Sequence, residues 1–407
     1  MPNEIVTSKS NTGSLPPFSG GDALDITVAN VRDLFPIAAR RAYLNNAAIS
    51  PVSQPVLQAV DSFLHDVRDN GDKSYSGWCV YADTDIKSRV GRLIGADAAE
   101  IAFVKNTTEG LVTVANGLDW KEGDNLLLPE IEYPSNVLCW KQLARRGVTI
   151  KWIKARDGRI DIADISAAID ARTRLVSVSA VQFSNGFRQD LVNLSDLCVS
   201  RGLLLNVDAI QQVGSMALNL GEIHIDFLSF GGHKWLLAPI GTGIFYCNRK
   251  SLDFLVPPNV GYHSFDHGDC ISNDLDFRPN AGRFEEALVN FPGIWGLDAA
   301  VRMHLAVGQR RTEAHILDLT DYAAERLRSH GWTIKSPRDG RERSGLLSFG
   351  RTGINAEETA LHLRAQGIDI AVQTDRLRIS PSLYNNRDDI DRLVAALPIA
   401  HNSFGEG

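Results

Sequence analysis

The sequence predicts an α/β protein with a mostly parallel, seven-stranded sheet in a large domain, followed by a smaller α+β domain. Between residues 96 and 250, short apolar runs alternate with longer amphipathic runs, which is typical of strands joined by helical crossovers. The strand-like runs are mostly apolar, as expected for strands that helices cover on both faces. Beyond residue 300, long helical stretches and short strands replace this alternation.

Each predicted strand of the large domain is a short, mostly apolar run. These runs fall at residues 101–104, 125–128, 149–153, 174–180, 203–207, 226–230 and 243–247. Amphipathic periodicity predicts helices between them, among others at residues 110–118, 134–144, 161–169 and 193–201. For the small domain, the pattern predicts a long helical stretch at 296–330, strands at 333–334 and 345–349, and helices at 356–366 and 387–397.

The chain has 407 residues, of which 44% are hydrophobic, so its core is large enough for two or three domains. We expect a flexible N-terminal tail at residues 1–22, a large domain at 23–295 and a small domain at 296–407. The first residues of the large domain are expected to pack on the small one. The polar tail has neither a basic start nor an apolar stretch, so it does not resemble a secretory signal.

The charge balance argues against nucleic-acid and membrane partners, because the net charge is −7 and the basic residues form no long run. No apolar run approaches the roughly 20 residues of a transmembrane helix. The five cysteines lie far apart and form no C-x-x-C pair. This spacing argues against a disulfide framework and against a metal site, and it favours a reducing cytoplasm.

A lysine and an aspartate follow two buried strands. Asp208 ends the run at 203–207, and Lys234 follows the run at 226–230 after a Gly-Gly turn. Ligands of open α/β sheets bind outside the carboxyl ends of strands. The pair suits pyridoxal phosphate (PLP), because Lys234 can form a Schiff base with the cofactor aldehyde and Asp208 can keep the pyridine nitrogen protonated. A surface lysine and a structural strand-end aspartate are the alternatives.

Polar residues follow two further strands at the same edge. Thr107 and Thr108 open a helix, where hydroxyls and free amide groups can hold the cofactor phosphate. An ordinary helix cap is the alternative. Ser184 and Asn185 follow the strand at 174–180. Polar groups from four strand ends therefore converge on one edge of the predicted sheet.

Three other side chains are candidates for contact with the cofactor or the substrate, and each also has a simpler structural interpretation. Gln211 can donate to the phenolic oxygen of the cofactor, or it is a solvated turn residue. Tyr133 can stack on the pyridine ring, or it is a core tyrosine. The guanidinium of Arg378, in a run that alternates with apolar residues, can bind a substrate carboxylate bidentately, or it lies on a surface strand.

Substrate specificity is expected from two loops, at residues 75–81 and 259–269. Their candidate lining residues are Trp78, Tyr262, His263 and His267.

Taken together, the motifs resemble the class V aminotransferase superfamily of fold-type I PLP enzymes, in its branch of cysteine desulfurases, selenocysteine lyases and isopenicillin N epimerase-like proteins. The resemblance covers about residues 40–397. It is carried by YLNNAA at 43–48, NTTEG at 106–110, DAIQ at 208–211, GHK at 232–234, RFEEALVN at 283–290 and RIS at 378–380.

The resemblance implies a role for each matching residue. Lys234 would be the Schiff-base lysine that also moves the α-proton, Asp208 would pair with the pyridinium, and Gln211 with the phenolate. The phosphate would be bound by Thr108 and His233, with Thr107 nearby. The residues near the substrate would be Asn46, Ala48, Asn185 and Arg378, of which Asn185 also approaches the cofactor. The family also implies a homodimer with sites at the subunit interface.

The chain departs from the family pattern at several positions. Desulfurases carry a mobile-loop cysteine shortly before the carboxylate-binding arginine, but the shortened segment at 371–378 has none, and Cys270 is far upstream. Tyr133 replaces the histidine over the ring. Gly231 and Leu288 replace a serine and a threonine of the phosphate site.

We therefore expect a PLP-dependent enzyme that acts on an α-amino acid, with β-elimination of the C–S type first because it needs only one base and an open pocket. Transamination comes second; epimerisation needs a second base, and decarboxylation in specialised metabolism also fits. A PLP-binding regulatory protein without catalysis is the alternative of another class. A dinucleotide-dependent dehydrogenase is discarded, because no G-x-G-x-x-G follows a strand near the N-terminus.

Overall fold

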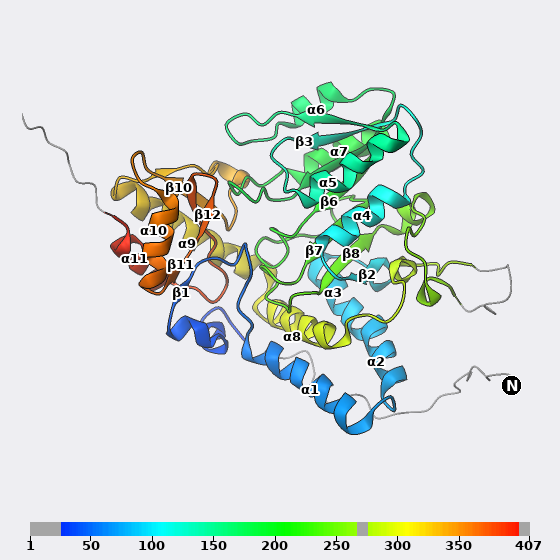
Figure 1. Cartoon of the computed structure of the whole chain (residues 1–407), viewed down its shortest axis with the longest axis horizontal. Helices are drawn as coiled ribbons and strands as arrows, with labels where there is room; N and C mark the ends of the chain where they lie inside the picture. Colours follow the sequence, from blue (N-terminus) through cyan, green and yellow to red (C-terminus); the bar gives the residue numbers. More distant parts are fainter. Residues whose placement is uncertain (1–25, 267–275, 399–407) are drawn as a thin grey trace, which may run out of the picture.

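A seven-stranded sheet forms the centre of the larger part of the computed structural model, which describes residues 26–266 and 276–398 (Figure 1). The strand order is β2-β8-β7-β6-β5-β3-β4, and β8 runs antiparallel to both of its neighbours while the other pairs are parallel. The prediction of a mostly parallel seven-stranded sheet is confirmed. Its strands are β2 (Ile101–Val104), β3 (Asn125–Pro129), β4 (Thr149–Ile153), β5 (Thr173–Ser179), β6 (Leu204–Asp208), β7 (Phe227–Gly231) and β8 (Gly243–Cys247).

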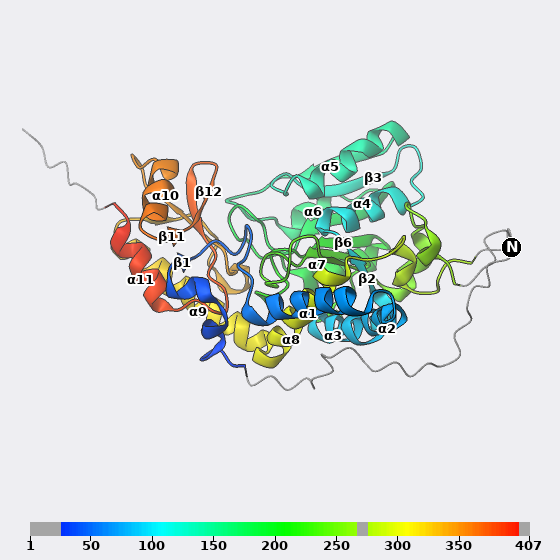
Figure 2. The same cartoon turned by 60° about the horizontal axis from the view of Figure 1, so that its bottom comes forward.

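Successive strand residues point to opposite faces, so each strand feeds two cores. In β3, Leu127 packs into one core, whereas Leu126 and Leu128 pack into the other. In Figure 2, α1, α2 and α3 line the lower face of the large sheet. The helices around this sheet are α1 (Gln54–Asn70), α2 (Tyr75–Tyr81), α3 (Lys87–Ile94), α4 (Thr107–Gly117), α5 (Ser135–Lys141), α6 (Ile162–Ala168), α7 (Leu191–Arg201) and α8 (Phe291–Val307).

The predicted helical stretch at 296–330 is two helices, α8 and α9 (Gln309–Ser329). They are separated by Gly308, whose φ of 88° does not fit a right-handed helix. Trp295 and Leu297 of α8 pack in a core of the large sheet, whereas Leu327 of α9 packs in the core of the small sheet. The predicted domain limits stay a prediction.

A four-stranded antiparallel sheet, β12-β13-β10-β9, forms the smaller part of the fold, on the left of Figure 2. The N-terminal strand β1 (Ala42–Tyr43) pairs in parallel with β11 (Ile368–Asp369) beside it. The remaining elements are β9 (Thr333–Ile334), β10 (Leu347–Gly350), α10 (Ala356–Ala365), β12 (Ala371–Gln373), β13 (Arg376–Ile379) and α11 (Arg387–Ala396). Apart from the long helical stretch, the predicted small-domain strands and helices are confirmed to within about two residues at either end.

The prediction of a specificity loop at 75–81 is wrong, because these residues form the helix α2. Trp78 is buried, its ring centroid lies 4.8 Å from that of Phe63, and its indole nitrogen donates to Asp66 at 2.7 Å. Tertiary packing of this aromatic face overrides the loop-like composition, so Trp78 does not line the site as expected.

The second predicted specificity segment is only partly described. Tyr262 and His263 lie in a short 3₁₀ helix, Tyr262–Ser264, and Tyr262 is 60% exposed. His267 and the expected tail at 1–22 lie outside the described residues. Among the helices of residues 26–266 and 276–398, none is both long and apolar enough to cross a bilayer.

Candidate active site

Lys234 lies just past the carboxyl end of β7, next to β6, which ends at Asp208. The two groups interact electrostatically. Burial lowers the pKa of Lys234, and burial raises the pKa of Asp208 despite a 3.0 Å hydrogen bond from the amide of Ile210. The structure therefore brings the predicted amine and carboxylate together at one sheet edge.

The backbone of the Lys234 turn is held on two sides. Ser50 donates its amide to the carbonyl of His233 at 2.9 Å and its hydroxyl to the carbonyl of Lys234. Leu237, with a φ of 62°, donates its amide to the same Lys234 carbonyl at 2.9 Å. A non-glycine residue in this left-handed region is strained, so the surrounding contacts fix the turn that carries the amine.

Tyr133 faces the amine. The Lys234 Nζ lies 5.6 Å from the centroid of the Tyr133 ring, and Tyr133 is 43% exposed. The edge of the ring packs on Phe183, with centroids 5.1 Å apart. The alternative of a buried core tyrosine is wrong, and an aromatic surface next to the amine is available for a flat ligand.

Arg378 is a buried cation without an anion. It is 2% exposed, so the alternative of a surface strand arginine is wrong. Its Nη1 donates to the carbonyl of Phe183 at 2.6 Å, its Nε has no partner, and no carboxylate of the described residues pairs with it. Burial lowers its pKa to about 10. An isolated buried charge is costly, so this guanidinium suits an incoming carboxylate.

The start of α4 has free hydrogen-bonding capacity. The cap of this helix is Asn106, whose side chain accepts from the amide of Glu109 at 3.0 Å, so the alternative of a threonine cap is wrong. The hydroxyl of Thr107 is buried without a partner among the described residues, and that of Thr108 contacts the Ser135 hydroxyl at 2.9 Å. An unpartnered hydroxyl at a helix N-terminus fits a phosphate.

His233 explains one departure from the family pattern. A Cβ on Gly231 would lie 3.0 Å from the His233 ring, so a serine at 231 would crowd the histidine. Burial and the charge of Lys234 both lower the pKa of His233. The residues present therefore fit PLP, because they bring together a candidate phosphate site, an amine, a carboxylate, an aromatic surface and a guanidinium that no described carboxylate pairs with.

Two predicted amides are held by the protein itself. Gln211 is buried, so it is not a solvated turn residue; its side chain donates to the carbonyl of Ala47 at 3.2 Å and accepts from Trp235 at 2.8 Å. The Asn185 amide donates to the carbonyl of Gly158 at 2.7 Å. Their contacts with cofactor or substrate stay predictions.

The two predicted substrate residues of the N-terminal segment differ in solvent exposure. Asn46 is fully buried, donating to the carbonyl of Ser380 at 2.9 Å and accepting from the hydroxyl of Tyr384 at 2.9 Å. The structure therefore uses the Asn46 amide to join this segment to the small sheet. Ala48 is half-buried beside it.

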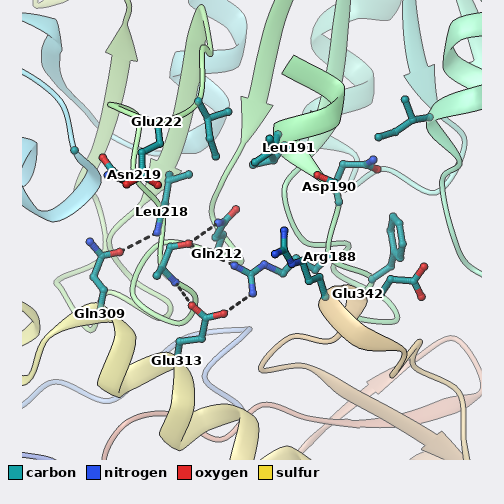
Figure 3. Close-up of a pocket in the computed structure, with 18 of the residues that line it drawn as sticks. Arg188, Asp190, Leu191, Gln212, Leu218, Asn219, Glu222, Gln309, Glu313 and Glu342 are labelled. Atoms are coloured by element: carbon teal, nitrogen blue, oxygen red, sulfur yellow. Dashed lines mark hydrogen bonds and ion pairs between the residues drawn. The ribbon is translucent and has the colours of Figure 1, made fainter. Parts of the chain in front are cut away.

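A separate cavity of about 940 Å³ lies where α9 and the segment at 340–342 meet the large sheet (Figure 3). Arg188 pairs with Glu313 across it, and Glu313 also accepts from the amide of Ala217 at 2.9 Å. The described residues that line it include none of the predicted cofactor or substrate residues. We therefore distinguish this cavity from the candidate active site.

A buried histidine beneath the Lys234 turn predicts a pH dependence of stability. His304 is 2% exposed, and burial lowers its pKa from 6.5 to about 4. The unfolded chain takes up this proton at a higher pH than the folded chain. The contribution of this histidine to the free energy of unfolding is therefore fully present above pH 6.5. It falls by up to about 3 kcal/mol as the pH drops from there through 4.

His304→Gln is expected to flatten this part of the curve of unfolding free energy against pH, measured by urea denaturation between pH 4 and 7. The matched control is His65→Gln on the surface of α1. An unchanged slope in His304→Gln would contradict the assignment.

Comparison with known proteins places these features in a family. The family model for aminotransferase class-V matches residues 42–393. A probable cysteine desulfurase of Methanothermobacter thermautotrophicus is 30% identical over 335 residues, which cover 81% of this chain and 83% of that protein. A cysteine desulfurase of Haloferax volcanii is 31% identical, covering 89% of this chain and 90% of that protein.

Solved structures share the fold. The apo structure of a cysteine desulfurase from Thermococcus onnurineus NA1 has a TM-score of 0.84 at 26% identity, covering 92% of this chain and 97% of that one. The cystine C-S lyase C-DES, in complex with its product cysteine persulfide, has a TM-score of 0.83 at 23% identity, covering 89% and 98%.

The seven-stranded sheet with a lysine and an aspartate at adjacent strand ends defines a fold-type I PLP-dependent enzyme. The family model extends over both sheets and over every predicted site residue. The chain belongs to the class V aminotransferase family, and its cofactor is PLP. This membership favours an enzyme over the regulatory protein considered above.

Proposed function

We propose that this enzyme is a β-eliminating lyase of the C–S type that acts on a sulfur-containing α-amino acid and does not carry sulfur on a cysteine of its own. The observation that supports it most is the hairpin before Arg378. β12 and β13 pair from Ala371 opposite Arg378 to Gln373 opposite Arg376, so only a two-residue turn joins them. This hairpin has no cysteine and no room for a mobile loop.

The thiols of the described residues support the same conclusion. Cys139, Cys198 and Cys247 are buried, and burial raises the pKa of each, to about 12 for Cys139 and Cys198. Burial also raises the pKa of Cys79. Because the thiolate is the nucleophile, none of these four cysteines is prepared to accept sulfur. Cys270 lies outside the described residues.

The similar proteins support sulfur chemistry at the site. The curated relatives are named cysteine desulfurases, and the C-DES structure is titled a cystine C-S lyase with its product cysteine persulfide. A C–S substrate therefore agrees with both names, whereas the hairpin favours elimination over transfer to an enzyme cysteine.

The mechanism follows from the side chains at the sheet edge. When bound, PLP supplies an electron-accepting ring that makes the α-proton of an attached amino acid acidic. Lys234 would hold the cofactor, and its lowered pKa makes the amine a base near neutral pH that can remove the α-proton. Asp208 would keep the proton on the ring nitrogen. Arg378 would orient the substrate by its α-carboxylate.

Product analysis separates the possible reactions. Elimination from cysteine gives pyruvate, ammonia and sulfide, whereas desulfuration gives alanine and sulfur bound to a thiol. We expect the PLP-loaded enzyme to release pyruvate and ammonia in equal amounts from cysteine or cystine. The double variant Cys79→Ser, Cys270→Ser should keep its rate within about twofold, because neither thiol takes part.

Alanine as the main product, lost in the cysteine variant, would contradict the proposal. An oxo acid formed only with an amino acceptor would indicate transamination, and loss of optical rotation without elimination would indicate epimerisation.

We also propose a cytoplasmic homodimer. Large apolar side chains are exposed on the described part of the chain, among them Ile240 at 68%, Tyr262 at 60% and Leu288 at 58%. Exposed apolar groups of this size suit a subunit interface. Light scattering of the purified protein measures the oligomeric state, and a monomer at micromolar concentration would contradict the homodimer.

A further inference from the structure

Glu132 is a buried carboxylate behind the candidate site, and the predicted roles do not use it. It is 6% exposed and lies next to Tyr133 in the chain. One oxygen accepts from the amide of Ser179 and from the side chain of Gln182, each at 2.7 Å. The other oxygen accepts from the hydroxyl of Ser179 and from the Asn136 amide, the latter at 3.0 Å.

The hydrogen-bond donors around Glu132 favour its ionised form. The Asn136 side chain can only donate here, because its oxygen already accepts from Trp140 at 3.0 Å and from Ser177 at 2.7 Å. The Ser179 amide is also an unambiguous donor, and it contacts the other oxygen. All four hydrogen bonds of Glu132 favour the charged form, whereas burial is the larger effect and raises its pKa. Three of its four partner groups, the Ser179 amide and the side-chain amides of Asn136 and Gln182, donate to this carboxyl, and the Ser179 hydroxyl is the one that can also accept.

The sheet places this charge beside Asp208. Ser179 of β5 is the strand partner of Asp208 of β6, and Glu132 bonds both the amide and the hydroxyl of Ser179. The charge of Glu132 acts on Asp208 and raises its pKa. The other ionisable groups that act in this region are Lys234, Arg378, His233 and Cys139.

Glu132 also connects the two ends of the site. Its partner Gln182 precedes Phe183, whose carbonyl accepts from Arg378 at 2.6 Å and whose ring packs on Tyr133. The side-chain oxygen of Gln182 has no hydrogen-bond partner among the described residues. Its orientation is therefore set by the contact with Glu132.

We infer that Glu132 is a positioning residue whose fixed negative charge, one strand behind Asp208, makes the site prefer a cofactor ring with a protonated nitrogen. Two neighbouring carboxylates stabilise a proton on the pyridine nitrogen better than one does. The inference rests on the proposed pairing of Asp208 with that nitrogen.

The test compares two cofactors that differ only at the ring nitrogen. PLP and its 1-deaza analogue, in which carbon replaces that nitrogen, are titrated into the cofactor-free full-length protein. The measured quantity is the dissociation constant of the analogue divided by that of PLP, so a high ratio means a preference for PLP. Glu132→Gln should reduce the preference for PLP about tenfold, the equivalent of one pKa unit. A loss of packing would weaken both cofactors equally and leave the ratio unchanged.

Matched variants separate the possible outcomes. Glu130→Gln makes the same change two residues away on the exposed surface and should leave the ratio as in the wild type. Ser179→Ala removes one donor from the Glu132 carboxylate and should give part of the effect, which covers the case in which Glu132→Gln does not fold. If neither variant lowers the ratio while Asp208→Asn does, the inference is overturned and the proposed function stands. If Asp208→Asn also leaves the ratio unchanged, the cofactor pairing itself is wrong.

Discussion

Lys234→Ala is expected to abolish the visible absorption of bound cofactor and to reduce turnover by at least about a thousandfold, because one side chain provides both the attachment point and the base. The amine is buried next to Asp208 and faces Tyr133, and the structure offers no second lysine in that position among the described residues. Absorption spectra and steady-state rates of the two proteins, each dialysed with PLP, measure the effect.

The matched control is Lys250→Ala, at an exposed lysine beyond β8. It should retain both absorption and turnover. Turnover of Lys234→Ala close to that of the wild type would contradict the assignment of the base, even if the colour were lost.

Arg378→Gln is expected to lower kcat/KM by about a hundredfold, which corresponds to roughly 3 kcal/mol for a charge-assisted contact with the substrate. The guanidinium is 2% exposed and has no carboxylate partner among the described residues, so a substrate carboxylate would be its natural counter-ion. The measurement compares kcat/KM for an α-amino acid with kcat/KM for the same compound with its carboxylate converted to an amide, which lacks the negative charge. The wild type should prefer the acid strongly, and the variant should not.

Arg376→Gln provides the control on the same strand. Arg376 also lies on β13, but its side chain is 44% exposed. We expect the control to keep the preference of the wild type for the acid. If Arg378→Gln retained that preference too, another cation would have to bind the carboxylate.

Much of the fold could be predicted because each strand of the large sheet is a local apolar run between turn residues. The strand order could not, because it depends on contacts between distant segments, such as β2 with β8. The pairing of β1 with β11 joins residues near 42 and 368, and two-residue strands carry no periodic signal. The break at Gly308 was visible as a glycine, but residues that favour helix on both sides masked it.

The site was predicted best where a residue type has one dominant chemical use. Lys234 and Arg378 are charged residues in apolar surroundings, and in the structure Lys234 is half-buried and Arg378 is buried. Glu132 was missed because two of the residues that bind it, Ser179 and Gln182, are about 50 residues away in the sequence. The only local signal was a carboxylate directly before Tyr133, at the end of an apolar strand.

The central claim is that the side chain of Lys234 is joined covalently to PLP at a site shared with Asp208. Treatment of the PLP-loaded wild-type protein with borohydride makes such a carbon–nitrogen bond permanent, and peptide mass spectrometry then locates it. The account predicts a reduced phosphopyridoxyl group on the peptide that contains Lys234. Its stable attachment to a different lysine, with Lys234 unmodified, would contradict the account.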